Sequence, residues 1–205
     1  MRSFNYRNSN DFLRISYNTT GFLNIPVIKR QEINESNIEY ISFDKIKYRD
    51  NKTNKSKYVH FFDCYPLLLE PYINIHQFDK RLFQYSAIFT PYVKIDENTP
   101  KWEIITNTAM SRWCGNQWQN SNCKVITSVS WLDLNTYDIC FSGIEKYSSV
   151  AVSCLDYEDR DIFLNGYEHL YRKIEPQYVF CYGKPLKEMV GNIIEISVVN
   201  NKEDN

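Results

Sequence analysis

Short apolar runs and longer amphipathic segments alternate along the second part of the chain. The apolar runs have the length of single strands, and they lie at 85–90, 125–131, 137–144, 150–154, 178–182 and 193–199. Most of them are continuous rather than alternating, which is typical of strands buried on both faces of a sheet. The pattern therefore predicts a sheet that is covered on both faces by other parts of the chain.

Two segments between these runs have the period of a helix. After the Thr-Pro pair at 99–100, apolar residues recur every three or four positions and predict a helix over 101–120, with the threonine as its cap. A second helix is expected to begin near Asp159 and to end before Pro176. The predicted elements follow one another in the order strand, helix, strand, strand, helix, strand. This order is typical of parallel crossover units. The predicted fold class is therefore α/β, a mostly parallel sheet with flanking helices.

The first part of the chain is less regular. Residues 40–48 alternate between two faces, 49–57 are polar, and 58–62 form an aromatic, strand-like run. Strand, polar loop and strand together predict a β-hairpin. The expected organisation, all within one domain, is an irregular region with this hairpin at 1–80, an α/β core at 81–199 and a disordered tail at 200–205.

Composition narrows the class of protein. The 205 residues suffice to bury a core without a disulfide or a metal. With 24 Lys and Arg against 25 Asp and Glu, the chain is neither a wholly basic nucleic-acid coat nor a highly charged disordered segment. The 16 tyrosines favour recognition surfaces, because tyrosine covers a large area with few rotors and keeps a polar tip. A host-protein partner is therefore one hypothesis.

Targeting and metal signals do not stand out. The first residues are polar, and the longest apolar run, at 65–69, is far shorter than the ~20 residues of a membrane helix. We therefore expect a cytoplasmic protein with no membrane partner. The six cysteines include no CxxC pair, and the three histidines have no ligand spacing, so reduced thiols, no metal and no cofactor are expected.

The strand ends supply the candidate chemistry, because ligands of open parallel sheets bind outside the carboxyl ends of the strands. The candidate catalytic residues for acid–base work are Asp133, Asp156 and Tyr182. The candidate ligand contacts are Thr90, Tyr92, Arg112, Trp131 and Lys184. Aspartates at strand ends also commonly cap the turn or helix that follows, so a structural role stays open for both aspartates.

Standard catalytic motifs are missing from the chain. There is no GxxxxGK[ST] or GxGxxG loop to cradle phosphates, and no GxSxG or HExxH motif. Only six glycines are present. These observations disfavour ATP-driven enzymes and hydrolases.

A basic segment lies between the two runs that predict the hairpin. Its cations are Lys45, Lys47, Arg49, Lys52, Lys55 and Lys57, and Tyr48 and Tyr58 are interleaved with them. Lysines neutralise phosphates and aromatic rings stack on exposed bases, so this segment is the candidate nucleic-acid contact. The alternative is an ordinary solvated loop.

Spaced aromatic residues and glycines over about 60–185 resemble a known pattern. The matching stretches include Phe89-Thr90-Pro91, Ser111-Arg112-Trp113, Gln117-Trp118-Gln119, Ser130-Trp131, Phe141-Ser142-Gly143-Ile144, Val150-Ala151-Val152-Ser153, Phe163-Leu164-Asn165-Gly166 and Tyr182-Gly183. This pattern is similar to an uncharacterised domain-of-unknown-function family carried by phages, prophages and plasmids of low-GC bacteria. The chain departs from it at Tyr92, where the family usually has Asp, and at Leu155-Asp156, where it usually has Gly.

Three functional hypotheses follow. The resemblance implies an accessory protein of a phage or plasmid, and with the basic segment it suggests a task in replication or copy-number control. The alternative is an enzyme or binder that acts on a small phosphorylated or nucleotide-like ligand at the carboxyl ends of the strands. The second alternative is a module that binds a host protein.

Overall fold

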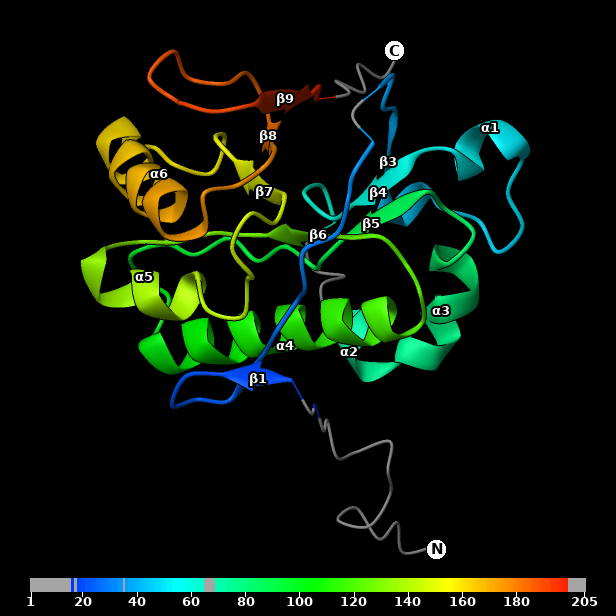
Figure 1. Cartoon of the computed structure of the whole chain (residues 1–205), viewed down its shortest axis with the longest axis horizontal. Coiled ribbons are helices and arrows are strands. Elements are labelled where there is room, and N and C mark those ends of the chain that lie inside the picture. Colours follow the sequence, from blue (N-terminus) through cyan, green and yellow to red (C-terminus); the bar gives the residue numbers. More distant parts are fainter. Residues whose placement is uncertain (1–15, 17, 35, 65–68, 199–205) are drawn as a thin grey trace, which may run out of the picture.

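A seven-stranded parallel sheet forms the centre of the molecule. The computed structural model describes residues 16, 18–34, 36–64 and 69–198 (Figure 1). Every neighbouring pair of strands in the sheet is parallel, and the strands lie side by side in chain order. They are β3 (Tyr40–Ser42), β4 (Tyr58–His60), β5 (Ala87–Phe89), β6 (Val125–Ser128), β7 (Val150–Ser153), β8 (Val179–Tyr182) and β9 (Ile193–Ile196). This confirms the α/β class predicted from the sequence. The expected tail at 200–205 lies outside the described residues.

The helices connect successive strands. They are η1 (Phe43–Lys45), α1 (Lys52–Lys55), α2 (Leu69–Ile73), α3 (Ile75–Leu82), α4 (Lys101–Asn120), α5 (Leu134–Cys140) and α6 (Arg160–Ile174). Both helices predicted from periodicity, α4 and α6, are confirmed. The expected cap of α4 is wrong, because the helix begins after Pro100 and the Thr99 hydroxyl instead donates to Asp96.

The hairpin predicted at 40–62 is wrong. Tyr40 pairs with Tyr58 in a parallel register, so β3 and β4 are the first two strands of the main sheet. The polar segment between them turns the chain back through η1 and α1, and the Asn51 side chain caps α1 by accepting from the Asn54 amide. A connection of this length is what a parallel crossover needs. An antiparallel hairpin does exist, between β1 (Thr19–Thr20) and β2 (Ile25–Pro26).

The apolar run at 137–144 is also not a strand. It contains most of α5, which begins with a capping box: the Asp133 carboxylate accepts from a backbone amide of the first turn, and the Thr136 hydroxyl accepts from the Asp133 amide. Gly143 then ends the element with a φ of +73°. A Cβ at this glycine would lie 2.3 Å from the carbonyl oxygen of Pro26, so a side chain has no room there.

The sheet curls so that its two edges approach each other across the inner face. The ring of Phe180 in β8 lies 6.4 Å from that of Tyr40 in β3 and 5.4 Å from that of Phe89 in β5, measured between centroids. Strands in simple chain order place their crossovers on one side, and α4, α5 and α6 wrap the outer face (Figure 1). The strands are therefore buried on both faces, but the inner face is filled by their own side chains and by Ile33 and Ile38.

The two ends of this inner core differ. At the amino end, the Tyr58 hydroxyl donates to the Asn34 carbonyl at 2.9 Å, and Ile33 packs against the core. The segment between β2 and β3 therefore closes that end. At the carboxyl end, β4, β5, β7 and β8 finish in polar and aromatic residues, and this end holds the candidate site.

Candidate functional site

Six side chains gather where four parallel strands end. We call them the mouth cluster, and they are His60, Phe62, Asp63, Tyr92, Asp156 and Tyr182. His60 and Tyr182 are the last residues of β4 and β8, and the others follow β4, β5 and β7 within three residues. Because parallel strands all present their carboxyl ends at one edge, residues far apart in the chain meet here.

Aromatic rings and carboxylates alternate in the mouth cluster. The Phe62 ring stacks on that of Tyr182, with 4.9 Å between centroids and 13° between planes, and its centroid lies 4.7 Å from that of Tyr92. The Tyr92 hydroxyl donates to Asp156 Oδ2 at 2.7 Å, and the Tyr182 hydroxyl donates to Asp63. Each tyrosine therefore holds one carboxylate at the rim of the inner core.

Burial fixes the protonation of these groups. It raises the pKa of Tyr92 well above its usual value, and the neighbouring Asp156 charge adds to the effect. Burial also raises the pKa of Tyr182, and its hydrogen bond to Asp63 does the same. Both hydroxyls therefore stay protonated and serve as donors.

His60 is the buried base of the mouth cluster. Burial lowers its pKa to about 4, although the nearby charges of Asp63 and Asp44 oppose the shift. Its Nδ1 is buried and has no hydrogen-bond partner among the described residues. The imidazole is therefore neutral near pH 7 and keeps an unused ring nitrogen.

The structure brings together only part of the predicted catalytic set. Asp156 and Tyr182 meet in the mouth cluster with Tyr92. Asp133 is exposed at the start of α5, where its carboxylate accepts from the Asn135 amide at 3.0 Å. It thus fills the capping role that the sequence left open. Lys184 is exposed just beyond β8.

Two predicted ligand contacts are enclosed by their own neighbours. Thr90 has no exposed surface, and its hydroxyl accepts from the Ser128 amide at 2.9 Å. Trp131 is also fully buried, and a Cβ at Gly166 would lie 2.0 Å from its Nε1. That close approach requires a glycine in the middle of α6. Neither side chain reaches the mouth cluster's surface.

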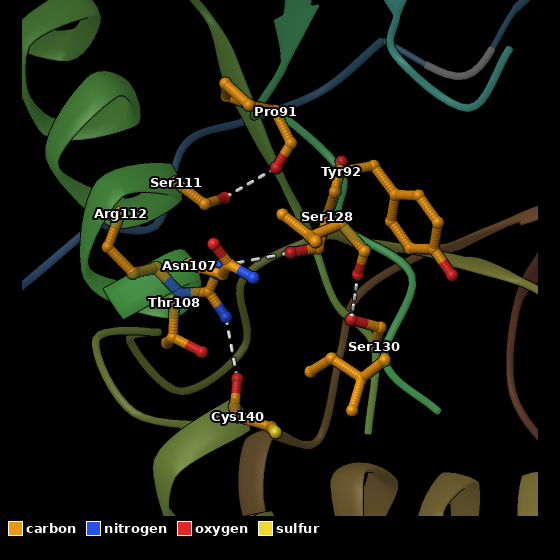
Figure 2. A pocket seen from close by; sticks show the side chains of 11 residues that line it. Pro91, Tyr92, Asn107, Thr108, Ser111, Arg112, Ser128, Ser130 and Cys140 are labelled. Carbon is orange, nitrogen blue, oxygen red and sulfur yellow. Dashed lines mark hydrogen bonds between the residues drawn. The ribbon is translucent and has the colours of Figure 1, made fainter. Parts of the chain in front are cut away.

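Arg112 joins α4 to two other elements instead of pointing into the mouth. Its guanidinium donates to the carbonyls of Ser128 and Ser142 at 3.0 Å and of Cys140 at 2.7 Å. Burial lowers the pKa of Arg112 to about 10, so the group remains a cation near pH 7. A polar pocket of about 20 Å³ lies beside it (Figure 2).

A larger pocket of about 430 Å³ opens next to the mouth cluster. Phe62, Tyr92 and Asp156 form part of its wall, and the loop from β5 to the start of α4 forms much of the remainder. Its charged side chains are one lysine and three carboxylates, Lys94, Asp96, Glu103 and Asp156. We call this space the mouth pocket, and its formal charge is negative.

None of the predicted nucleic-acid residues lines the mouth pocket, although the charge of Lys45 acts on His60 in the mouth cluster. Lys47, Arg49, Lys52 and Lys55 are exposed on the crossover that leads to the amino end of β4, and Lys45 is exposed in η1. Lys57 is half-buried and forms an ion pair with Glu39 at 3.3 Å. Figure 1 shows α1 beside the β3 edge of the sheet. The segment is thus a solvated surface, and its binding role stays a prediction.

Three members of the mouth cluster, His60, Phe62 and Asp63, are not among the candidates predicted from the sequence. They lie in or just after the run at 58–62, and the carboxyl end of a parallel strand is where a ligand site is expected. A hairpin assignment of this run hides that signal, because it gives the run no place in the parallel sheet. A parallel assignment of β4 points to all three residues.

Within the described residues, no helix combines the length and the apolar character that crossing a membrane requires. The nucleic-acid partner, the host-protein partner and the cytoplasmic location stay predictions.

The chain is similar to proteins of two mycobacteriophages. It is 26% identical over 176 residues to "Gene 1 protein" of Mycobacterium phage L5, covering 84% of this chain and 76% of that protein. It is 29% identical over 102 residues to "Gene 1 protein" of Mycobacterium phage D29, covering 48% of this chain and 38% of that protein. No solved structure matches.

The family assignment rests on nearly the whole described fold. A family model described as "Domain of unknown function (DUF4417)" matches residues 17–200, which include every strand of the sheet and the mouth cluster. The expected phage-associated, uncharacterised family is confirmed, while a low-GC host stays a prediction. The chain belongs to the DUF4417 family of domains of unknown function.

Proposed function

We propose that this protein is a phage accessory protein that binds a small molecule with a planar, nitrogen-rich ring in the mouth pocket. The observation that carries the proposal is the wall of that pocket, where the rings of Phe62 and Tyr92 lie beside the carboxylate of Asp156. Aromatic faces stack on planar rings, and a carboxylate accepts from ring or amino N–H groups. Nucleobases combine both features.

The charge of the mouth pocket bears on which ligand it binds, because the sequence left open a phosphorylated ligand and a nucleotide-like one. Three carboxylates and one lysine line it, so a phosphate group meets net repulsion there. Asp156 Oδ2 is occupied by the Tyr92 hydroxyl, and no described residue donates to Oδ1. The free oxygen supports an N–H donor on the ligand. An uncharged base or nucleoside is therefore favoured over a phosphorylated nucleotide.

Thermal unfolding against a ligand panel tests this proposal. Bases and nucleosides are expected to raise the Tm, and the matching 5′-monophosphates to raise it less. A ligand at about 100 times its Kd adds about 2.7 kcal/mol to the free energy of unfolding. The variant D156N replaces the carboxylate that supplies the free acceptor, so the ligands are expected no longer to raise its Tm. D133N makes the same change at the α5 cap and should keep it. A flat panel, or an equal loss in both variants, contradicts the proposal.

The basic segment supports a second function, binding of DNA or RNA during replication or copy-number control of the phage or a plasmid. Five of its six cations are exposed, and Tyr48 between them is 58% exposed. A cationic surface with an exposed ring is suited to phosphates and unstacked bases. This surface is distinct from the mouth pocket, so the two functions are separately testable.

Salt-dependent binding and copy number test the second function. The variant K47E/R49E/K52E is expected to lose binding to labelled DNA or RNA at low salt. A control triple, K29E/K101E/K187E, changes the charge equally at other exposed positions and should bind with a smaller loss. In cells, deletion of the gene is expected to change the element's copy number. An equal loss of nucleic-acid binding in both triple variants would mean that only the net charge of the protein matters, and it would contradict a specific role of the basic segment.

A further inference from the structure

The polar pocket beside Arg112 differs chemically from the mouth pocket. Asn107, Thr108 and Arg112 line it from α4, and Ser111, Ser128 and Ser130 complete its polar wall (Figure 2). Its volume of about 20 Å³ is sufficient for one water-sized species, since a single water needs at least ~10–15 Å³. A phosphate or a nucleobase is too large for it.

Arg112 brings an uncompensated positive charge to this pocket. The residue is 2% exposed, and none of the described ion pairs involves it. A guanidinium has five N–H donors, and three are used on backbone carbonyls. Removing an unpaired charge from water is costly, so a counter-charge in contact with it stabilises the fold.

Two further donors face the same space without partners. Asn107 is 8% and Thr108 is 7% exposed, and neither side chain makes a hydrogen bond to another described residue. Polar side chains buried to this degree are nearly always hydrogen-bonded in folded proteins. Neither is among the fully buried polar atoms that lack a partner, so both groups are open to the space of the pocket and can reach an occupant there.

The three serines that line the pocket, Ser111 on α4 and Ser128 and Ser130 at the end of β6, act differently. The hydroxyls of Ser111, Ser128 and Ser130 donate to the carbonyls of Pro91, Thr90 and Val93, respectively. Their protons are thus committed. The donors that remain for an occupant all come from the Asn107, Thr108 and Arg112 face of α4.

We propose that the polar pocket binds one small monovalent anion of halide size, held by Arg112, Asn107 and Thr108. The anion neutralises the buried guanidinium and satisfies the two unpartnered side chains. Tyr92 lines both pockets, so the bound anion also steadies the wall of the mouth pocket. This site goes beyond the proposed function, because Arg112, Asn107 and Thr108 do not line the mouth pocket and the ligand is an anion instead of an uncharged base.

Anion-specific stability tests the site in the full chain. At constant ionic strength, chloride and bromide are expected to raise the Tm saturably, whereas gluconate, which is too large for the pocket, is not. Crystals grown in bromide are expected to show an anomalous peak between Arg112 and Asn107. The variants N107L and T108V leave the three carbonyl bonds of Arg112 in place and should lose the halide effect. T106V changes an exposed threonine of the same helix and should keep it.

Two results would overturn the proposal. Equal stabilisation by halides and gluconate, with no anomalous peak, assigns the pocket to a water molecule. A halide effect that persists in both N107L and T108V places the anion elsewhere. D156N leaves the polar pocket intact, so its halide dependence is expected to match the wild type whether or not the mouth pocket binds a base.

Discussion

His60 is the residue that most directly links burial to chemistry in this molecule. Its ring centroid lies 5.8 Å from that of Tyr182 and 6.0 Å from that of Phe62, so aromatic surface surrounds it. This environment disfavours the charged form, and the lowered pKa of about 4 follows mainly from burial. In the unfolded chain the imidazole has its usual pKa near 6.5. Folding is therefore linked to the release of a proton.

The sign of this linkage predicts a loss of stability in acid. Between about pH 4 and 6.5 the unfolded chain binds more protons at His60 than the folded chain, so the free energy of unfolding rises with pH. The contribution is fully present above about pH 6.5 and is lost as the pH falls toward about 4. Its upper bound is about 3 kcal/mol, from about 1.4 kcal/mol for each pH unit.

Urea unfolding at several pH values measures this contribution. The variant H60N is expected to show a weaker pH dependence than the wild type between pH 4 and 6.5. H169N changes an exposed histidine and keeps every carboxylate, as H60N does, so a pH dependence that is weaker in H60N than in H169N belongs to His60. Parallel profiles for H60N and the wild type would contradict the linkage.

The start of α5 supplies a prediction for one element. Asp133 was a catalytic candidate from its place in the sequence, yet in the fold it caps a helix of seven residues. D133A is expected to lower the free energy of unfolding by about 1 kcal/mol, because the first-turn amide loses its acceptor. D133S supplies another capping oxygen and is expected to recover most of the loss. Thermal unfolding of the three proteins checks this, and a D133S as unstable as D133A would argue against a capping role.

The elements that the sequence predicts well are those with a long repeat. α4 spans 20 residues, and its apolar period defined both ends to within one residue. α5 is too short for a period to emerge, so its apolar residues were mistaken for a strand. The run at 40–48 and the run at 58–62 are strand-like in either a hairpin or a crossover, and only the register distinguishes the two.

Half of the mouth cluster was predictable from the sequence, and the other half was not. Tyr92, Asp156 and Tyr182 follow recognised strands, so the strand-end rule located them. His60, Phe62 and Asp63 were lost with the wrong pairing of one strand. The role of Arg112 depends on carbonyls 16 to 30 residues further along the chain, and no local pattern contains that information.

At the scale of the whole molecule, the curl of the sheet decides whether the mouth cluster forms. Phe180 in β8 contacts rings from β3, β4 and β5, with centroids 6.4 Å from Tyr40, 6.3 Å from Tyr58 and 5.4 Å from Phe89. These contacts hold the first strands of the chain against one of the last. They also place Tyr40 and Tyr58, from the first two strands, in the same inner core as Phe180.

Hydrogen exchange on two matched variants tests this coupling. F180L removes ring contacts on the inner face and F163L on the outer face, and both residues are almost fully buried. Each is expected to cost about 1–3 kcal/mol. In F180L, backbone exchange should quicken in β3, β4 and β5 as well as in β8, because one cluster joins them. In F163L the faster exchange should centre on α6 and the residues around Trp131, whose ring lies 5.3 Å from that of Phe163. Unchanged protection of β3 and β4 in F180L would mean that the first strands are stabilised independently of β8, and a mouth cluster built from both ends of the sheet would then lose its physical basis.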